Sequence, residues 1–161
     1  MIFHGKPTVL GVSTGAVAGL VAITPAAGFV TPLGAIAMGL VVSVICYFMI
    51  SFVKAKLGYD DSLDAFGVHG IGGIFGAIAT GVFASKAVNS AGANGLFYGN
   101  AHQVTIQLIA VGATIAYAVI GTLIIAGVVH VLTGGMRVTE KAEDIGLDLT
   151  ETHETAYTVL Q

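Results

Sequence analysis

Formal charge is scarce in this sequence. Asp, Glu, Lys and Arg make up 9% of the 161 residues, whereas hydrophobic residues make up 55%. Soluble domains carry about 25% charged residues, so the composition, with a mean hydropathy of +0.91, indicates a membrane protein. The net charge of -3 offers no basic surface of the kind that binds nucleic acid.

Cysteine is almost absent as well. Cys46 stands alone inside an apolar run, so the chain cannot build a disulfide framework, and the thiol is predicted to be inert. The first seven residues lack the regions of a cleaved signal peptide. They are predicted to be a short polar lead into a first span.

The features of an enzyme are also missing. No nucleophile and base stand at a readable spacing, and no glycine-rich phosphate loop is present. His69 has no second His, Cys or acid three or four residues after it, so a zinc site would need ligands from elsewhere. The sequence therefore predicts no enzyme, no metal and no cofactor.

Long apolar runs are what the sequence has in abundance. Four runs approach or exceed the ~20 residues that cross a bilayer as a helix. They do not alternate as barrel strands do, so the predicted fold class is an all-α integral membrane protein. The predicted spans are residues 8–29, 33–53, 62–83 and 102–133. The fourth is long enough that it must tilt or project beyond the membrane.

Basic residues predict the orientation. Four spans place both termini on one side of the membrane, and that side carries five basic residues against Lys86 alone on the other. By the positive-inside rule both termini are cytoplasmic. The five are Lys6, Lys54, Lys56, Arg137 and Lys141. Residues 1–133 are the predicted membrane domain. Residues 134–161, with eight of the 15 charged residues, are a cytoplasmic tail that is either solvated or a docking surface.

The connections also carry signals. Gly11, Gly15 and Gly19 recur every four residues and predict a smooth face for close helix packing, with the wall of a pore as the second interpretation. The segment between Pro25 and Pro32 is a tight connection with few polar residues, so it is expected to pack on protein. Residues 85–100 are polar and are expected to be an exposed connection with little structure.

The third span contains the main functional candidate. Asp61 is predicted to cap this helix, and Asp64 to lie at its third position, where a negative charge is favourable. His69 then lies inside an apolar run, where an ionisable ring is costly and often functional. With 3.6 residues per turn, its face holds small residues, namely Ala65, Gly72, Gly73, Gly76 and Thr80. That row is compatible with a narrow lumen or with close packing of a neighbouring helix.

The other histidines are weaker candidates. His102 and His130 lie near the ends of the fourth span, where packing or capping is expected. His4 and His153 lie in polar termini and receive no role.

Three blocks of sequence resemble a known family. The first is Lys6 to Gly11 with residues 18–26, the second is Asp60 to Gly70, and the third is Gly146 to Asp148 with Ala156 and Tyr157. Together they resemble the C-terminal part of the ammonium transporters of the Amt/Mep/Rh group. The resemblance implies the last four helices of an eleven-helix fold built from two inverted five-helix halves. It also implies trimers with one pore in each subunit.

The resemblance also implies roles for particular residues. His69 matches the second histidine of a pore pair, which makes Ala65, Gly72 and Gly73 candidate pore residues. Asp61 matches the acid that begins this helix. The tail is implied to contact neighbouring subunits and to dock a PII-type protein. Its candidate residues are Arg137, Gly146, Leu147, Asp148 and Tyr157, although Thr152-His153 stands where the family has His-Gly.

About seven family helices, with the first pore histidine, have no counterpart here. The first hypothesis is therefore a partial ammonium transporter of the plasma membrane, inactive without those helices. It would act as a homotrimer or with an N-terminal half. The second is a non-transporting module that binds a full-length subunit or a PII-type protein. The third is a small channel-like homo-oligomer built around His69.

Overall fold

The computed structural model describes residues 8–155. The chain forms two compact units, residues 1–114 and 115–161. The division falls inside the last long helix, whereas the sequence predicted a boundary after residue 133.

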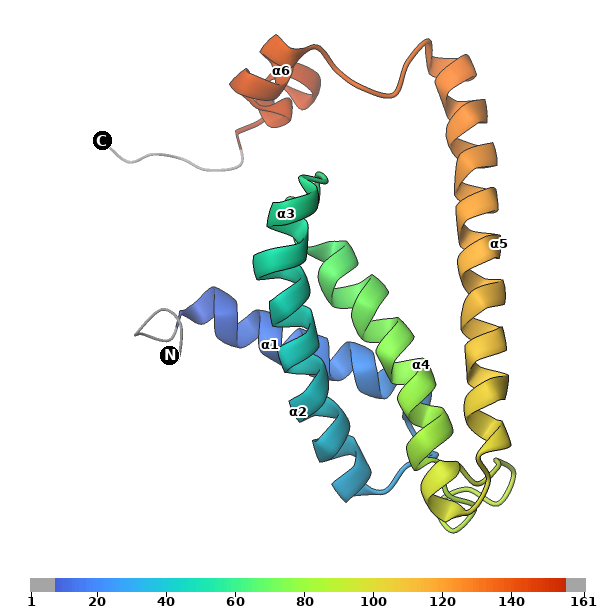
Figure 1. The fold of residues 1–161 in the computed structure, drawn as a ribbon. Helices are drawn as coiled ribbons and strands as arrows, with labels where there is room; N and C mark the ends of the chain where they lie inside the picture. Colours follow the sequence, from blue (N-terminus) through green and yellow to red (C-terminus); the bar gives the residue numbers. More distant parts are fainter. Residues whose placement is uncertain (1–7, 156–161) are drawn as a thin grey trace. The chain divides into compact units, whose positions relative to one another are not determined.

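The described chain is helical apart from one isolated antiparallel bridge between Val30 and Ala84 (Figure 1). The α-helices are α1 Val9–Ile23, α2 Pro32–Phe48, α3 Ala55–Leu57, α4 Ile71–Phe83, α5 His102–Thr133 and α6 Glu140–Ile145. Short 3₁₀ turns occupy η1 Thr24–Ala26 and η4 Leu96–Tyr98. Wider π-helical segments occupy η2 Met49–Lys54, η3 Phe66–Gly70 and η5 Asp148–Thr152.

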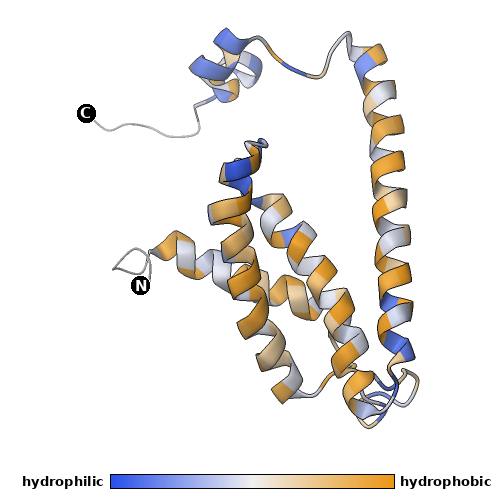
Figure 2. Ribbon diagram, viewed as in Figure 1, coloured by the Kyte–Doolittle hydropathy of each residue, from blue (hydrophilic) through white to orange (hydrophobic). Residues whose placement is uncertain are grey.

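The prediction of four membrane-crossing helices is confirmed. Among residues 8–155, four helical runs are long and apolar enough to cross a membrane: Val9–Ala26, Pro32–Leu57, Phe66–Phe83 and His102–Thr133. The second extends four residues further than predicted because η2 and α3 continue it. The third begins four residues later because residues 62–64 lie in a non-helical turn. Figure 2 shows these runs as predominantly apolar, with hydrophilic residues gathered at the turn after α3 and in α6.

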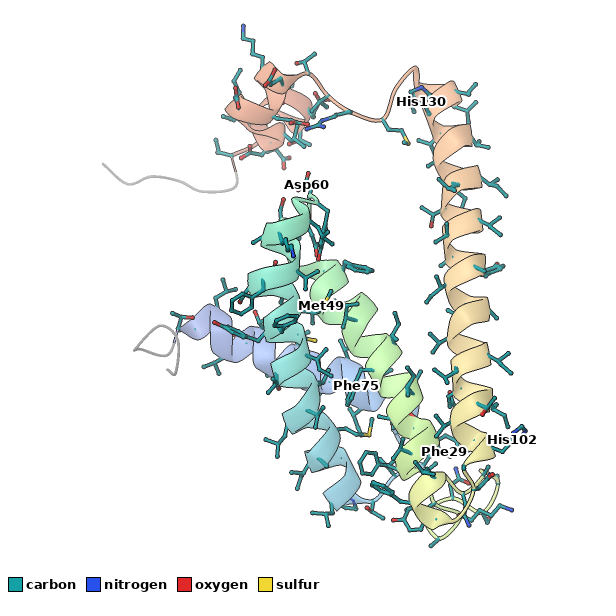
Figure 3. All side chains as sticks on the ribbon, viewed as in Figure 1. Phe29, Met49, Asp60, Phe75, His102 and His130 are labelled. Atoms are coloured by element: carbon teal, nitrogen blue, oxygen red, sulfur yellow. The ribbon has the colours of Figure 1, made fainter. Side chains whose placement is uncertain are left out.

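The core of the first unit lies where α1, α2 and α4 meet. One cluster joins Ala18 and Ala22 of α1 to Val42 and Cys46 of α2, with Val68 from η3. A second cluster contains the buried side chains of Met38 from α2 and Ala79 from α4. The ring of Phe75 borders both clusters (Figure 3). The members are mostly small, so the helix backbones can approach closely, as is usual between membrane helices.

The glycine stripe of α1 does not make this contact. A Cβ atom built on Gly15 or Gly19 would meet nothing within 4 Å, and one on Gly11 would meet only the hydroxyl of Thr8. No helix of the first unit packs on these glycines, so close packing at this face stays a prediction. The buried alanines Ala18 and Ala22, also four residues apart, make the close contact instead.

The connection between α1 and α2 packs against protein, as predicted. Val30 is buried and bridges Ala84, and the Ser85 N–H donates to the Phe29 carbonyl at 2.9 Å. Two loops that are far apart in sequence are thus joined by backbone hydrogen bonds, which satisfies polar groups that lie out of reach of water.

Residues 85–100 are mostly exposed, as expected, and their one regular element is η4, but hydrogen bonds order the loop more than the sequence predicted. The Asn94 side-chain oxygen accepts from the Lys86 N–H at 2.8 Å, and the Gly95 N–H donates to the Ala84 carbonyl at 2.7 Å. A Cβ on Gly95 would lie 2.7 Å from the carbonyl oxygens of Gly81 and Val82. Asparagine and glycine are common in exposed turns, but here they close the backbone of a packed loop.

The helix α5 has the predicted length of 32 residues. Its first turns pack on α4, since a Cβ on Gly81 would lie 3.0 Å from the Val104 Cα atom. None of its described residues is buried. Apolar on every face, it is a helix whose surroundings are expected to be lipid or other protein.

Candidate functional site

The turn before η3 is organised by the carboxylate of Asp61. It accepts hydrogen bonds from the backbone N–H groups of Ala65 at 2.8 Å, Phe66 at 3.0 Å and Gly67 at 3.4 Å. These are N–H groups that the first turn of a helix leaves without partners. Asp61 therefore satisfies the start of the helix that carries His69 and places a negative charge at its positive end.

Asp64 does not lie at the third helical position, as the sequence predicted. Its backbone is left-handed, with φ of 55°, and it lies in the turn before the helix. The Asp64 N–H donates to the Asp61 carbonyl at 3.0 Å, which closes the turn. The carboxylate of Asp64 instead contacts the Lys54 ammonium at 2.7 Å. Aspartate tolerates a left-handed backbone better than most residues do.

Replacement of Asp61 by alanine is expected to lower the free energy of unfolding by about 1–2 kcal/mol, the usual loss for a helix cap. Chemical unfolding in mixed micelles, followed by circular dichroism, measures this change. Asp60→Ala is the matched control, because the exposed Asp60 accepts only a long 3.3 Å bond from the Ser62 hydroxyl. Equal losses in the two variants would contradict the capping role.

His69 lies in η3, a π-helical segment. A π turn closes its hydrogen bonds one residue later than an α turn, and such segments recur at functional sites. The extra residue shifts the side chains after it, so the predicted face of small residues is split. A Cβ on Gly72 would lie 3.3 Å from Val21, and one on Gly73 would meet nothing within 4 Å.

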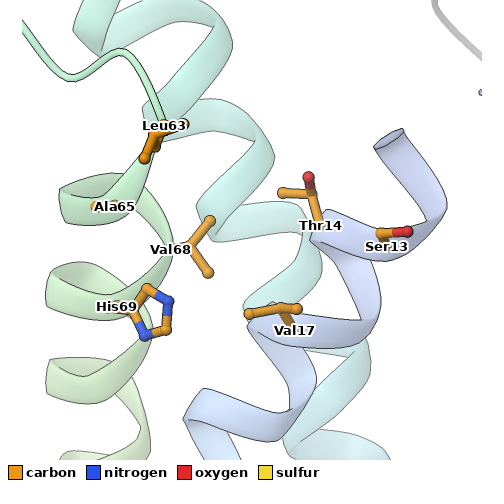
Figure 4. Close-up of a pocket in the computed structure, with 7 residues that line it drawn as sticks. All are labelled: Ser13, Thr14, Val17, Leu63, Ala65, Val68 and His69. Atoms are coloured by element: carbon orange, nitrogen blue, oxygen red, sulfur yellow. The ribbon is translucent and has the colours of Figure 1, made fainter. Parts of the chain in front are cut away.

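A cavity of about 310 Å³ lies between α1 and the start of the His69 helix. Figure 4 shows the His69 ring extending from its helix toward α1. The cavity is lined by Ser13, Thr14, Val17, Leu63, Ala65, Val68 and His69. The structure thus brings Ala65 to His69, whereas the candidate pore residues Gly72 and Gly73 are not in this lining.

Ser13 and Thr14 are site residues that the sequence reasoning missed. Their signal was available, because they are adjacent hydroxyl residues inside an otherwise apolar span. Each hydroxyl can both donate and accept a hydrogen bond, and a neutral imidazole offers one donor and one acceptor. With apolar walls from Val17, Val68 and Leu63, the cavity suits a small molecule that can form hydrogen bonds.

The candidate tail residues lie in the second unit. The Arg137 guanidinium donates to both carboxylate oxygens of Glu143, at 2.8 and 2.9 Å. This hydrogen bond holds the pKa of Glu143 below its usual value. Gly146, with φ of 109°, ends α6, and Leu147 and Asp148 begin the turn η5. Tyr157, the remaining candidate, lies outside the described residues.

The fold and the cavity indicate the general class of protein to which this chain belongs. The described residues contain four apolar helices that can span a bilayer, and a histidine and two hydroxyl residues line one cavity beside α1. These features indicate a multi-pass α-helical membrane protein. Within the described residues, no three His, Cys, Asp or Glu side chains gather as a metal site.

The comparison with known families is more specific. The chain belongs to the Ammonium Transporter Family, whose sequence model matches residues 1–157. Over 97% of its length it is 52% identical to an ammonium transporter of Bacillus subtilis. Over 96% it is 50% identical to ammonium transporter Amt1 of Archaeoglobus fulgidus. It spans 38% of the length of each of these relatives.

A solved structure agrees with the sequence comparisons. The crystal structure of Saccharomyces cerevisiae Mep2 matches 86% of the chain with a TM-score of 0.77 at 34% identity, and 32% of the Mep2 chain is covered. The resemblance to the family seen in the sequence is therefore confirmed, for a part of the full-length fold.

Proposed function

We propose that this chain forms the C-terminal portion of a protein that moves ammonium or ammonia across a membrane. The observation that carries the proposal is the cavity, into which the His69 ring extends toward α1 and which Ser13, Thr14 and apolar side chains also line. Membership of the family supplies the substrate class.

The cavity favours the neutral form of the substrate. An ammonium ion would lose its hydration in an apolar passage at a large cost, whereas ammonia loses far less. In the proposed passage, ammonium gives up a proton to the surrounding water before it enters, and ammonia crosses the apolar part. The His69 ring replaces a water molecule by exchanging a hydrogen bond with the passing ammonia. The first histidine of the pair would come from the part of the transporter that precedes these helices.

Four helices leave this passage incomplete. The glycine face of α1 meets nothing in the first unit, and the His69 ring is exposed. We therefore propose that the chain transports only with the preceding helices of the fold, as one subunit of a homotrimer or with a separate N-terminal half. Both termini would be cytoplasmic and the membrane would be the plasma membrane.

The test joins this chain to the N-terminal part of the Bacillus subtilis transporter that precedes the matched region, and expresses it in cells that lack ammonium uptake. We expect uptake from the fused protein and none from either part alone. No uptake by a fused protein that reaches the membrane would overturn the proposed function. Uptake by this chain alone would overturn its dependence on the missing helices.

The tail supports a second proposal, a docking role. Ile145, Leu147 and Leu149 expose 51%, 49% and 44% of their surfaces, which leaves apolar area for a partner such as a neighbouring subunit or a PII-type protein. Co-purification of a PII-type protein with the chain, lost when residues 134–161 are removed, tests it. If co-purification persists after this removal, the tail is not the docking site.

A further inference from the structure

A lysine at the end of η2 contacts the turn that begins the His69 helix. The Lys54 ammonium donates to the Asp64 carboxylate at 2.7 Å and to the Asp61 backbone carbonyl. The two paired side chains are only 27% and 30% exposed. An ion pair that is partly shielded from water is worth more than one on an open surface.

The turn held by Lys54 leads directly into the segment that carries the ring. The Asp61 carboxylate holds the first N–H groups of this helix, and the Asp64 carbonyl accepts from the Val68 N–H at 2.9 Å. Val68 precedes His69 and lines the same cavity. A movement of Lys54 would therefore reach the ring through two hydrogen bonds, from Lys54 to Asp64 and from Asp64 to Val68, and then through the peptide bond to His69.

The two π-helical segments also touch. A Cβ atom on Gly67 of η3 would lie 2.7 Å from the Ile50 side chain of η2. A π segment is rare because its hydrogen bonds compete with those of an α-helix. A return of η3 to α geometry would rotate His69 relative to the rest of α4. Contacts at the start of η3 are therefore needed to keep this segment in π geometry.

We propose that Lys54 is a positioning residue for His69. By binding Asp64 and the Asp61 carbonyl, it holds the turn that sets the π register of η3, and so it directs the ring toward α1 and the cavity. The consequence for transport rests on the proposed function, whereas the consequence for the direction of the ring does not.

The chain offers a matched control. Lys56 lies two residues further on, is exposed, and lies on α3. Lys54→Met removes the charge and keeps most of the apolar stem. Lys54→Arg keeps the charge and can donate to both oxygens. Asp64→Asn weakens the same contact without a large change in shape.

The first measurement concerns the ring itself. The chain is labelled with ¹³C and ¹⁵N at histidine and placed in lipid nanodiscs, and the His69 signals are assigned with His69→Gln. We expect Lys54→Met to shift or split the His69 ring signals, while Lys54→Arg and Lys56→Met leave them unchanged. Unchanged His69 signals in Lys54→Met would overturn the proposal. If Lys54→Met does not fold, the His69 ring signals are measured in Asp64→Asn instead, with the same expected shift.

The second measurement is uptake by the fused transporter. We expect Lys54→Met to lower the maximal rate about tenfold or more, since small displacements of a positioned group have effects of this size, with little change in KM. Lys54→Arg should restore the rate. A fused protein that does not transport at all contradicts the proposed function, and the ring signals still decide the role of Lys54.

Discussion

Replacement of Gly76 by alanine is expected to push α1 and α4 apart and to destabilise the first unit by about 1–3 kcal/mol, the usual cost of overpacking. A Cβ atom at this position would lie 2.3 Å from the Ala22 carbonyl oxygen, and 2.9 and 3.0 Å from the C and Cα atoms of Ala22. All three are backbone atoms, so a side-chain rotation cannot relieve the clash and a helix must move.

Gly73 provides the matched control on the same helix. A Cβ there would meet nothing within 4 Å, and alanine is the better helix former by about 1 kcal/mol. Gly73→Ala is therefore expected to be neutral or stabilising, whereas Gly76→Ala should unfold at lower denaturant. Unfolding in mixed micelles, followed by circular dichroism, separates the two. A Gly76→Ala variant as stable as the original chain would show that α1 and α4 do not approach as closely as described.

Replacement of His69 by alanine is expected to lower ammonium uptake by the fused transporter about 10- to 100-fold. An unmade hydrogen bond in an apolar site costs about 1–3 kcal/mol, and the ring is the one group on its side of the cavity with both a donor and an acceptor. Uptake is measured as an initial rate at equal amounts of protein in the membrane.

His102→Ala is the control for that experiment. His102 is an exposed histidine at the start of α5 and is not in the cavity lining, so its loss should leave the rate unchanged. If the two variants transport equally well, the cavity around His69 is not on the path of the substrate.

The sequence predicted the number of spans correctly, but it did not predict all of the contacts between them. The apolar runs show which segments can enter a bilayer, because the cost of transfer depends on composition and length. They do not show which face of a helix meets another. The glycine stripe of α1 was a reasonable packing face, yet Ala18 and Ala22 make the contact, since either row of small residues permits close approach.

The candidate site was also only partly predictable from the sequence. His69 could be selected from sequence because an ionisable ring in an apolar run is rare. Its neighbours could not, because the predicted face assumed 3.6 residues per turn throughout. The π segment Phe66–Gly70 breaks that period, so Gly72 turns toward Val21 and Cys46. Ser13 and Thr14 come from another span, and only the packing of α1 against α4 brings them to the ring.

The sequence alone determined that this chain is a four-span membrane protein of the ammonium transporters, with one histidine as its main candidate. Hydrophobicity and a few specific sequence blocks are local properties, so they can be recognised in the sequence without knowledge of the fold. Only the tertiary structure decided that Asp64 pairs with Lys54, that residues 85–100 form a packed loop, and that His69 shares a cavity with two hydroxyls. These depend on contacts between residues far apart in sequence, which form only when the helices pack.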